Sequence, residues 1–375
     1  MKRKKTASLL AFLLLASVAL TAAWTKRQIS KNPGQSYTPR IAVSGQYVYA
    51  VWFDSAPDNW EILFSKSADN GSTWQAPQRL TSNSGYSNHP GVAASSANVY
   101  TAWFDDTPGN YEIYFKKSAD RGTTWQNDKR LTANAGQSAV PVIAVSGADI
   151  YVAWYDDTSG YYRIYLKKSA DGGATWQPSQ TLTHGASNCW DPALAVSGAN
   201  VYLAWSNDAL GFGEIYFRRS NDGGATWQAV KRITHSAGNS QNPAIAVSGA
   251  NIFVAWDDDT PGNAEIYFRR STDRGLTWQS AQRLTFTAGE SEFPAVAASD
   301  ANVYVAWADD TPGNKEVYFK KSADGGATWQ ASQRLTNDAG DSWDPAVAVS
   351  SVNVYVAWMN ETSSGTDIFL KYSPL

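Results

Sequence analysis

Cysteine and histidine are scarce in this chain, which has one Cys and three His among 375 residues. A single Cys excludes a disulfide framework, and so few Cys and His exclude a zinc cluster of the usual spacing. Helical periodicity is missing as well, because no segment keeps apolar residues at helical spacing over three turns. Beyond residue 23, no apolar run approaches the length of a membrane-spanning helix. The sequence therefore excludes a fold that depends on disulfides, a zinc cluster or packed helices.

Basic residues are slightly outnumbered, with 31 Lys and Arg against 34 Asp and Glu. Four of the basic residues lie at positions 2–5, so the rest of the chain carries 27 basic and 34 acidic residues. Because no basic stripe follows, we expect no nucleic-acid partner. The hydrophobic fraction of 43%, with 17 Trp and 19 Tyr, argues against a disordered chain.

The N-terminus has the pattern of a secretory signal peptide over residues 1–23. A basic cluster precedes an apolar run from Ala7 to Ala23, and the small residues Thr21 and Ala23 fit a cleavage site before Trp24. The alternative is an uncleaved membrane anchor, although the run is short for a spanning helix. We expect residues 24–375 to be secreted to a periplasmic or extracellular location, with no membrane insertion after removal of the signal.

A repeat of 51 residues dominates the rest of the chain. The segment IAVSGQYVYAVW ends at Trp52, and its Trp recurs at 103, 154, 205, 256, 307 and 358. A second Trp closes the segment SADNGSTW at Trp74 and recurs at 125, 176, 227, 278 and 329. Within each unit, short runs of β-branched and aromatic residues alternate with Pro-Gly and Gly-rich turns, which predicts four strands.

Seven such units predict an all-β fold, a seven-bladed β-propeller of four-stranded blades, as one domain over residues 24–375. A solenoid would fit the period as well, but neither end resembles a capping repeat. The last unit ends after three strands at IFLKYSPL, and the segment WTKRQIS after the signal matches a fourth strand. We therefore expect the N-terminal strand to complete the C-terminal blade and close the ring, which removes free sheet edges.

Six copies of the motif Ser-x-Asp-x-Gly-x-Thr-Trp run from Ser67–Trp74 to Ser322–Trp329. The motif resembles the Asp-box, or bacterial neuraminidase repeat, and the resemblance to sialidase-like propellers covers nearly the whole chain after residue 23. Asp-boxes occur in sialidases, other glycoside hydrolases, lectin-like proteins and non-enzymatic propellers, so the resemblance implies a fold more than a function. We interpret the box carboxylates as structural acceptors for the turn: Asp69, Asp120, Asp171, Asp222, Asp273 and Asp324.

The resemblance to active sialidases implies three arginines that hold the substrate carboxylate, a Tyr–Glu pair and an acid/base Asp. Most arginines of this chain recur at repeated strand positions or within the boxes, and apart from Arg27 only Arg40 and Arg163 stand out of register. Two arginines do not make a cluster of three. The family's catalytic roles therefore cannot be assigned to particular residues, and we predict no catalytic residue.

Acidic pairs such as Asp105–Asp106 follow the second-strand Trp in several units. Their recurrence indicates a solvated turn with Asx-type hydrogen bonds, and a calcium site is the alternative. We expect no metal site and no cofactor.

Residues that break the repeat are the better candidates for a ligand site. In a propeller the loops before each inner strand and between the second and third strands share one face, opposite the Asp-boxes. We therefore expect a ligand at the channel mouth on that face, where an aromatic ring beside a carboxylate suits a sugar. The candidates are Tyr37, Arg40, His89, Arg163, Trp190, Asp191, Phe293, Trp343 and Asp344.

Two functions remain open at this point. The first is a secreted, monomeric propeller that binds a glycan or a cell-surface protein without turnover. The second is an exo-sialidase or other glycoside hydrolase whose carboxylates lie on the same face. Near-uniform loops favour the first, because catalysis needs a few unique groups in one asymmetric arrangement.

Overall fold

The computed structural model describes residues 23–31, 34–56, 59–363 and 365–375. The predicted signal peptide lies outside the described residues except for Ala23. Strands are the only regular secondary structure in the described ranges, and no helix there could cross a membrane.

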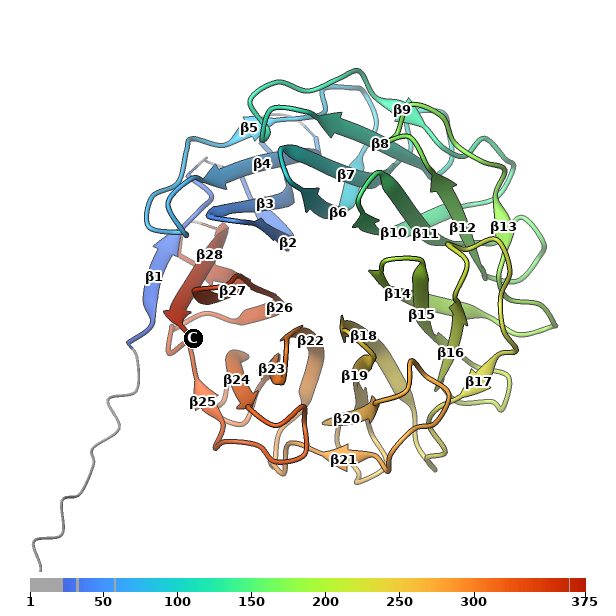
Figure 1. Ribbon diagram of the computed structural model, residues 1–375. Coiled ribbons are helices and arrows are strands. Elements are labelled where there is room, and N and C mark those ends of the chain that lie inside the picture. Colours follow the sequence, from blue (N-terminus) through green and yellow to red (C-terminus); the bar gives the residue numbers. More distant parts are fainter. Residues whose placement is uncertain (1–22, 32–33, 57–58, 364) are drawn as a thin grey trace, which may run out of the picture.

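Seven four-stranded antiparallel sheets, which we call blades I to VII, form a ring (Figure 1). The inner strands of blades I to VII are β2 (Ser36–Ser44), β6 (Ser87–Ser95), β10 (Ser138–Ser146), β14 (Cys189–Ser197), β18 (Ser240–Ser248), β22 (Ser291–Ser299) and β26 (Ser342–Val349). The second strands are β3 (Tyr47–Asp54), β7 (Asn98–Asp105), β11 (Asp149–Asp156), β15 (Asn200–Asn207), β19 (Asn251–Asp258), β23 (Asn302–Asp309) and β27 (Asn353–Thr362).

The remaining strands form the outer half of each blade. The third strands are β4 (Glu61–Ser67), β8 (Glu112–Ser118), β12 (Arg163–Ser169), β16 (Glu214–Ser220), β20 (Glu265–Ser271), β24 (Glu316–Ser322) and β28 (Gly365–Pro374). The outer strands are β5 (Gln78–Arg79), β9 (Lys129–Arg130), β13 (Gln180–Thr181), β17 (Lys231–Arg232), β21 (Gln282–Arg283), β25 (Gln333–Arg334) and β1 (Thr25–Gln28). Six outer strands have only two residues, which keeps the exposed sheet edges short.

The second strands carry the core, because each blade packs both of its faces against its neighbours. Apolar residues therefore fill both faces of these strands, in contrast to a sheet with one solvated face. The repeated Trp of the second strand is fully or almost fully buried in all seven blades. In six blades its ring stacks on a third-strand aromatic ring at centroid distances of 5.9–6.1 Å. The repeated Trp therefore serves to pack the core of each blade.

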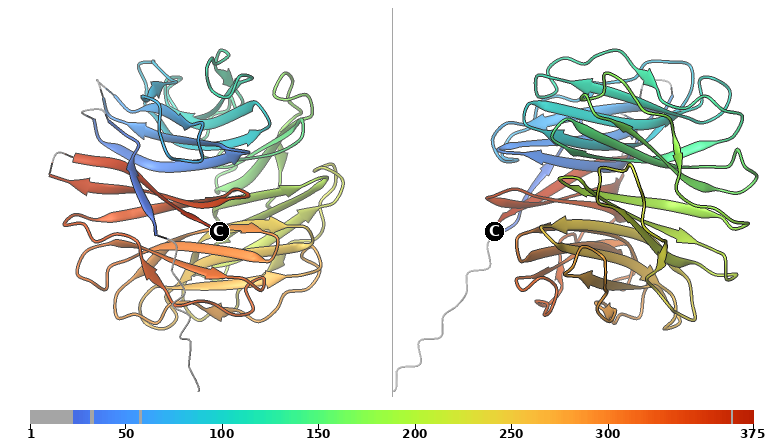
Figure 2. Two further views of the ribbon diagram at one scale, coloured as in Figure 1. Left: turned by 60° about the vertical axis from the view of Figure 1, so that its left-hand side comes forward. Right: turned by 45° about the vertical axis from the view of Figure 1, so that its right-hand side comes forward.

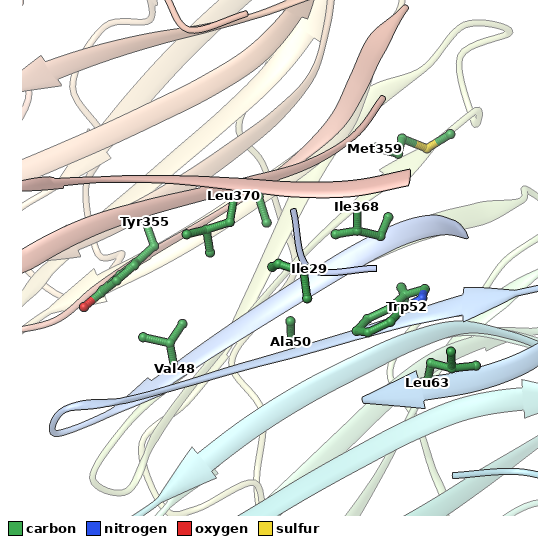
Figure 3. Packing of buried hydrophobic residues seen from close by; sticks show 10 residues of the cluster. Ile29, Val48, Ala50, Trp52, Leu63, Tyr355, Met359, Ile368 and Leu370 are labelled. Atoms are coloured by element: carbon green, nitrogen blue, oxygen red, sulfur yellow. The ribbon is translucent and has the colours of Figure 1, made fainter. Parts of the chain in front are cut away.

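The N-terminal strand closes the ring, as the sequence predicts. Strand β1 pairs with β28 in blade VII, and Figure 1 shows the two side by side. Ile29 follows β1 and is fully buried with Ile368 and Leu370 at the seam with blade I (Figure 3). Trp24 supplies the Trp that the incomplete seventh repeat lacks: its ring lies edge-on to Phe319 at 5.0 Å, as Trp329 does to Phe268 at 4.9 Å.

The Asp-boxes form the turns between the third and outer strands. In the first box, Asp69 accepts hydrogen bonds from the Ser67 hydroxyl at 2.7 Å and from the Thr73 N–H at 2.8 Å. Gly71 takes a φ of 86°, which a residue with a Cβ rarely adopts. Figure 2 shows the connecting loops projecting from opposite faces of the ring. Because strand direction alternates, the boxes lie on the face opposite the loops that enter the inner strands.

Candidate functional site

A central cavity of about 340 Å³ lies between the inner strands that surround the middle of the ring in Figure 1. One aliphatic side chain from every inner strand lines it: Ile41, Val92, Ile143, Leu194, Ile245, Val296 and Val347. Every blade therefore contributes an aliphatic side chain to the cavity wall, and Arg40, Asp191, Asn242 and Asp344 add polar groups to it. The volume lies within the range of sites for small ligands.

Each inner strand carries a bulge immediately before its proline. The register between inner and second strand shifts there in all seven blades, for example between Tyr37 and Arg40 in blade I. The residue before the proline has a positive φ of 48–54° in every blade: Thr38, His89, Val140, Asp191, Asn242, Phe293 and Asp344. Such backbone is costly for most side chains and is enriched near functional sites. Because the inner strand starts at the loop from the preceding blade, the bulges ring the cavity mouth opposite the Asp-boxes.

Arg40 and Asp344 meet at this mouth. Arg40 follows the proline of β2, where the other blades have Gly, Val or Ala. Its Nη1 donates to Oδ1 of Asp344 at 3.1 Å, across the seam between blades I and VII. Both residues line the cavity. Closure of the ring therefore joins two predicted site residues from opposite ends of the chain.

Asp257 is a buried carboxyl group at the end of β19, one residue after the second-strand Trp. Its Oδ2 accepts hydrogen bonds from Asn242 Nδ2 at 2.9 Å and from the backbone N–H of Phe293 at 3.1 Å. The residue is only 6% exposed. Burial raises the pKa of Asp257 to about 7, and the negative charges of Glu292 and Asp191 act in the same direction. Asp257 therefore holds a proton close to neutral pH.

Asp191 is a second carboxyl group of this kind, on the bulge of blade IV. It lines the cavity, and burial raises its pKa to about 6. Within the described ranges, neither Asp191 nor Asp257 forms an ion pair. Asp191 lines the cavity, and Asp257 lies behind the lining residues Asn242 and Phe293, so the two carboxyl groups are candidates for proton transfer there.

Lys315 brings a cation to the blade VI side of the mouth. Its Nζ donates to Glu292 Oε2 and lies 5.5 Å from the Phe293 ring centroid and 5.9 Å from that of Trp343. The two rings lie 6.2 Å apart. The loop of blade VI thus joins three bulge residues from blades VI and VII into one polar and aromatic cluster.

Tyr37 and His89 lie among aromatic rings on the side of blades I and II. Tyr37 contacts Phe53 and Trp60 at centroid distances of 5.6 and 5.3 Å. The His89 imidazole stacks between Phe53 and Phe104 at 5.5 and 5.2 Å, and its buried Nδ1 has no hydrogen-bond partner. Burial, with a smaller contribution from the positive charge of Arg40, lowers the pKa of His89 to about 4. The imidazole is therefore neutral at physiological pH.

Trp190 packs beside Asp191 on blade IV. Its ring lies 6.3 Å from that of Tyr162, which in turn lies 5.2 Å from Tyr155. Trp190 therefore continues the aromatic contacts of the neighbouring blade.

Arg163 lies apart from the cavity. Its side chain donates to the Ser159 hydroxyl and to the Gly185 carbonyl. It occupies the position at which five other blades have a Glu, and Thr181 replaces the Arg that pairs with that Glu in the same five blades. The irregularity of Arg163 thus marks a lost ion pair of the blade, outside the residues that line the cavity.

The Asp-box carboxylates also lie away from the mouth. Hydrogen bonds from Thr and Ser within each turn lower the pKa of all six box Asp residues. No group of three His, Cys, Asp or Glu in the described part of the chain is arranged to hold a metal ion.

The acidic pairs serve the turns, but their first member is buried rather than solvated. Asp105 accepts a hydrogen bond from the Ser87 hydroxyl at 2.6 Å and from the Thr107 N–H at 2.9 Å. Asp106 accepts from the backbone N–H of Tyr86. The pair thus fastens the inner strand to the following loop, as an Asx-type turn does.

Asp257 and Lys315 were not singled out by the sequence analysis. Asp257 is concealed in the run Asp257–Asp258–Asp259, of which only the last two belong to the repeated acidic pair. The other blades have Phe53, Phe104, Tyr155, Ser206, Ala308 and Met359 at its position. An alignment of the seven repeat units shows that Asp257 is the one acidic residue at this position.

A family model and a xyloglucanase match this chain in sequence. A family model described as BNR repeat-like domain matches residues 46–184 and 97–305. A xyloglucanase from Paenibacillus sp is 24% identical over 243 residues, which make up 57% of this chain and 23% of the relative. The chain thus spans less than a quarter of the length of that relative.

Solved structures of low sequence identity share the fold. The Hadza microbial sialidase Hz136 is 17% identical with a TM-score of 0.57, covering 88% of this chain and 74% of its own. The polysaccharide lyase Uly1 is 10% identical with a TM-score of 0.62, covering 90% of both chains. The phage phi92 endosialidase is 11% identical with a TM-score of 0.59, covering 94% of this chain and 69% of its own.

Proposed function

Because the chain belongs to the BNR repeat-like family, we propose that it is a secreted propeller that binds carbohydrate at the cavity mouth. The observation that carries the proposal is the break in sevenfold symmetry around the cavity. Every blade contributes one aliphatic side chain to the cavity, whereas Arg40, Asp257 and Lys315 each occupy their position in one blade only, and Asp precedes the proline in two blades, as Asp191 and Asp344. Carboxyl oxygens suit sugar hydroxyls, and the adjacent rings of Phe293 and Trp343 suit the apolar face of a sugar. The sialidase, lyase and xyloglucanase that resemble the chain bear names that all concern carbohydrates.

A glycan array probed with the secreted protein tests this proposal. We expect binding that Trp343→Ala lowers at least about tenfold, a loss of about 1.4 kcal/mol. Phe286→Ala is the matched control, because Phe286 is a 75% exposed ring in the loop after the outer strand β21 of blade V. Failure to bind any glycan would reject the proposal and would favour a protein-binding scaffold.

Glycoside hydrolysis is the second candidate, favoured by the pair Asp191 and Asp257. Glycosidases use two carboxyl groups, one of which must hold a proton at the working pH. If the protein hydrolyses a glycan, Asp257→Asn is expected to lower kcat at least about a hundredfold while ligand binding persists. Retention of full activity by this variant would reject the assignment.

Sialidase activity has less support than hydrolysis of other glycans. Of the arginines in the described part of the chain, only Arg40 lines the cavity. Its guanidinium group already forms an ion pair with Asp344. A fluorogenic sialoside is therefore expected to remain intact. Turnover of the sialoside that Arg40→Ala abolishes would overturn this expectation.

A further inference from the structure

Aromatic residues are distributed unevenly around the mouth. The position after the second-strand Trp is aromatic in blades I to III, with Phe53, Phe104 and Tyr155, and non-aromatic in the other four. The loop between second and third strands shows the same division, with Trp60, Tyr111 and Tyr162 against Gly213, Ala264 and Lys315 in blades IV to VI. Two separate positions of the repeat are thus aromatic in blades I to III and lose their aromatic residue from blade IV onward.

The rings of blades I and II touch one another around the mouth, and blade III adds a separate pair of rings. Trp60 lies 5.3 Å from Phe53, and His89 bridges Phe53 and Phe104 at 5.5 and 5.2 Å. Tyr111 lies 4.8 Å from Phe104. In blade III, Tyr155 lies 5.2 Å from Tyr162. We call these rings the aromatic arc: Trp60, Phe53, His89, Phe104, Tyr111, Tyr155 and Tyr162.

Part of this arc faces solvent. Tyr111 is 37% exposed, and the neighbouring loop residue Tyr161 is 40% exposed. Tyr111 packs on the buried ring of Phe104, which restricts its movement and makes it a rigid apolar platform. Such a platform can stack sugar rings at low entropic cost.

The charges on the other side of the mouth largely cancel within the protein. Arg40 pairs with Asp344 and Lys315 pairs with Glu292. The groups without an ionic partner, Asp191 and Asp257, are both acids. Among the described residues of the mouth, no cation is therefore left without an acidic partner to bind an anionic sugar, and Asp191 would repel such a sugar once it is ionised.

We infer that the ligand is an uncharged polysaccharide, bound over several sugar units along the aromatic arc, with one unit above the central cavity. This inference rests on the proposed carbohydrate-binding function and adds the charge and the length of the ligand. Stacking along the arc would supply affinity from several units, whereas the cavity alone would accommodate one.

Calorimetric titration with ligands of two lengths tests the inference. The probes are the disaccharides and hexasaccharides of cellulose, mannan and xylan, with sialyllactose as the anionic comparison. We expect at least one hexasaccharide to bind at least about tenfold more tightly than its disaccharide. Tyr111→Ala should weaken that hexasaccharide about threefold to tenfold, leave the disaccharide unchanged, and be rescued by Tyr111→Phe. Phe286→Ala should change neither, and thermal unfolding checks that each variant is folded.

Several results would overturn the inference and leave the proposed function intact. Equal affinity for the two lengths, or an unchanged hexasaccharide affinity in Tyr111→Ala, would show that the arc takes no part. Tighter binding of sialyllactose than of every neutral hexasaccharide would contradict the charge argument, as would the absence of hexasaccharide binding alongside a positive glycan array. A failure of the proposed function is distinct, because no glycan of any charge would then bind to the protein on the array.

Discussion

Replacement of Asp257 by Asn is expected to stabilise the folded protein increasingly as the pH rises from 5 to 8. The pKa of Asp257 is raised by burial to about 7, so the folded state keeps a proton that the unfolded chain releases above about pH 4. The free energy of unfolding of the wild-type protein therefore falls as the pH rises through the window from about 4 to about 7. Asn has no proton to lose, and its side-chain oxygen can still accept from Asn242 and from the Phe293 N–H.

The size of the effect follows from the two pKa values. With about 7 in the folded and about 3.9 in the unfolded state, the difference between variant and wild type should grow by roughly 2–3 kcal/mol between pH 5 and pH 8. Urea denaturation at the two pH values measures this difference. The titration of Asp191 is present in both proteins and largely cancels.

A charge control separates burial from net charge. Asp300→Asn removes an exposed carboxylate in the turn between β22 and β23, where Asn tolerates the φ of 52°. Its stability relative to the wild type should change by less than about 0.5 kcal/mol between the two pH values. If the Asp257→Asn difference is equally flat, Asp257 is ionised in the folded state at pH 5 and the proposed proton donor is lost.

Three further predictions concern the scaffold and His89. Ile29→Ala should lower the free energy of unfolding by about 2–4 kcal/mol in urea, because Ile29 is fully buried at the ring closure; a loss below about 1 kcal/mol would contradict that role. Arg163→Glu combined with Thr181→Arg should rebuild the ion pair found at 2.6–2.8 Å in four other blades, with a coupling of about 1–3 kcal/mol in a double-mutant cycle; zero coupling would refute the explanation. As the pH falls from 8 to 5, the free energy of unfolding of His89→Phe should rise by about 2 kcal/mol relative to that of the wild type. The reason is that the pKa of His89 is lowered to about 4 in the folded state, so the wild type loses stability below about pH 6.5. A difference that stays constant with pH would show that the pKa of His89 is not lowered.

The number of blades and the closure of the ring can be predicted from the sequence because every repeat unit has the same length. Seven copies of the second-strand Trp, six boxes, a last unit of three strands and an N-terminal segment that matches the fourth predict seven blades closed by the N-terminal strand, and the structure confirms this. The short outer strands were not predicted, since pairing at a sheet edge depends on exact register. The role of Trp24 was also missed, because it lies outside the 51-residue spacing and is placed only by packing on Phe319.

The site could be predicted only in part. Repeat-breaking residues before each proline include Asp191, Phe293 and Asp344, which line the cavity with Arg40. The pairing of Arg40 with Asp344 depends on the closed ring, and the burial of Asp257 depends on side chains from blades V and VI. No local pattern contains this information.

The bulges show why backbone strain does not locate the site. All seven blades adopt the positive φ before the proline, including Val140, whose branched side chain makes this conformation especially costly. Because all seven blades share this backbone strain, the strain is a property of the repeat and does not mark one blade as the site. Selectivity must then come from the side chains themselves, because blades I to III carry most of the aromatic rings and the buried carboxyl groups Asp191 and Asp257 lie in blades IV and V. A ligand that spans both groups of blades is held in one orientation, which a sevenfold symmetric mouth could not impose.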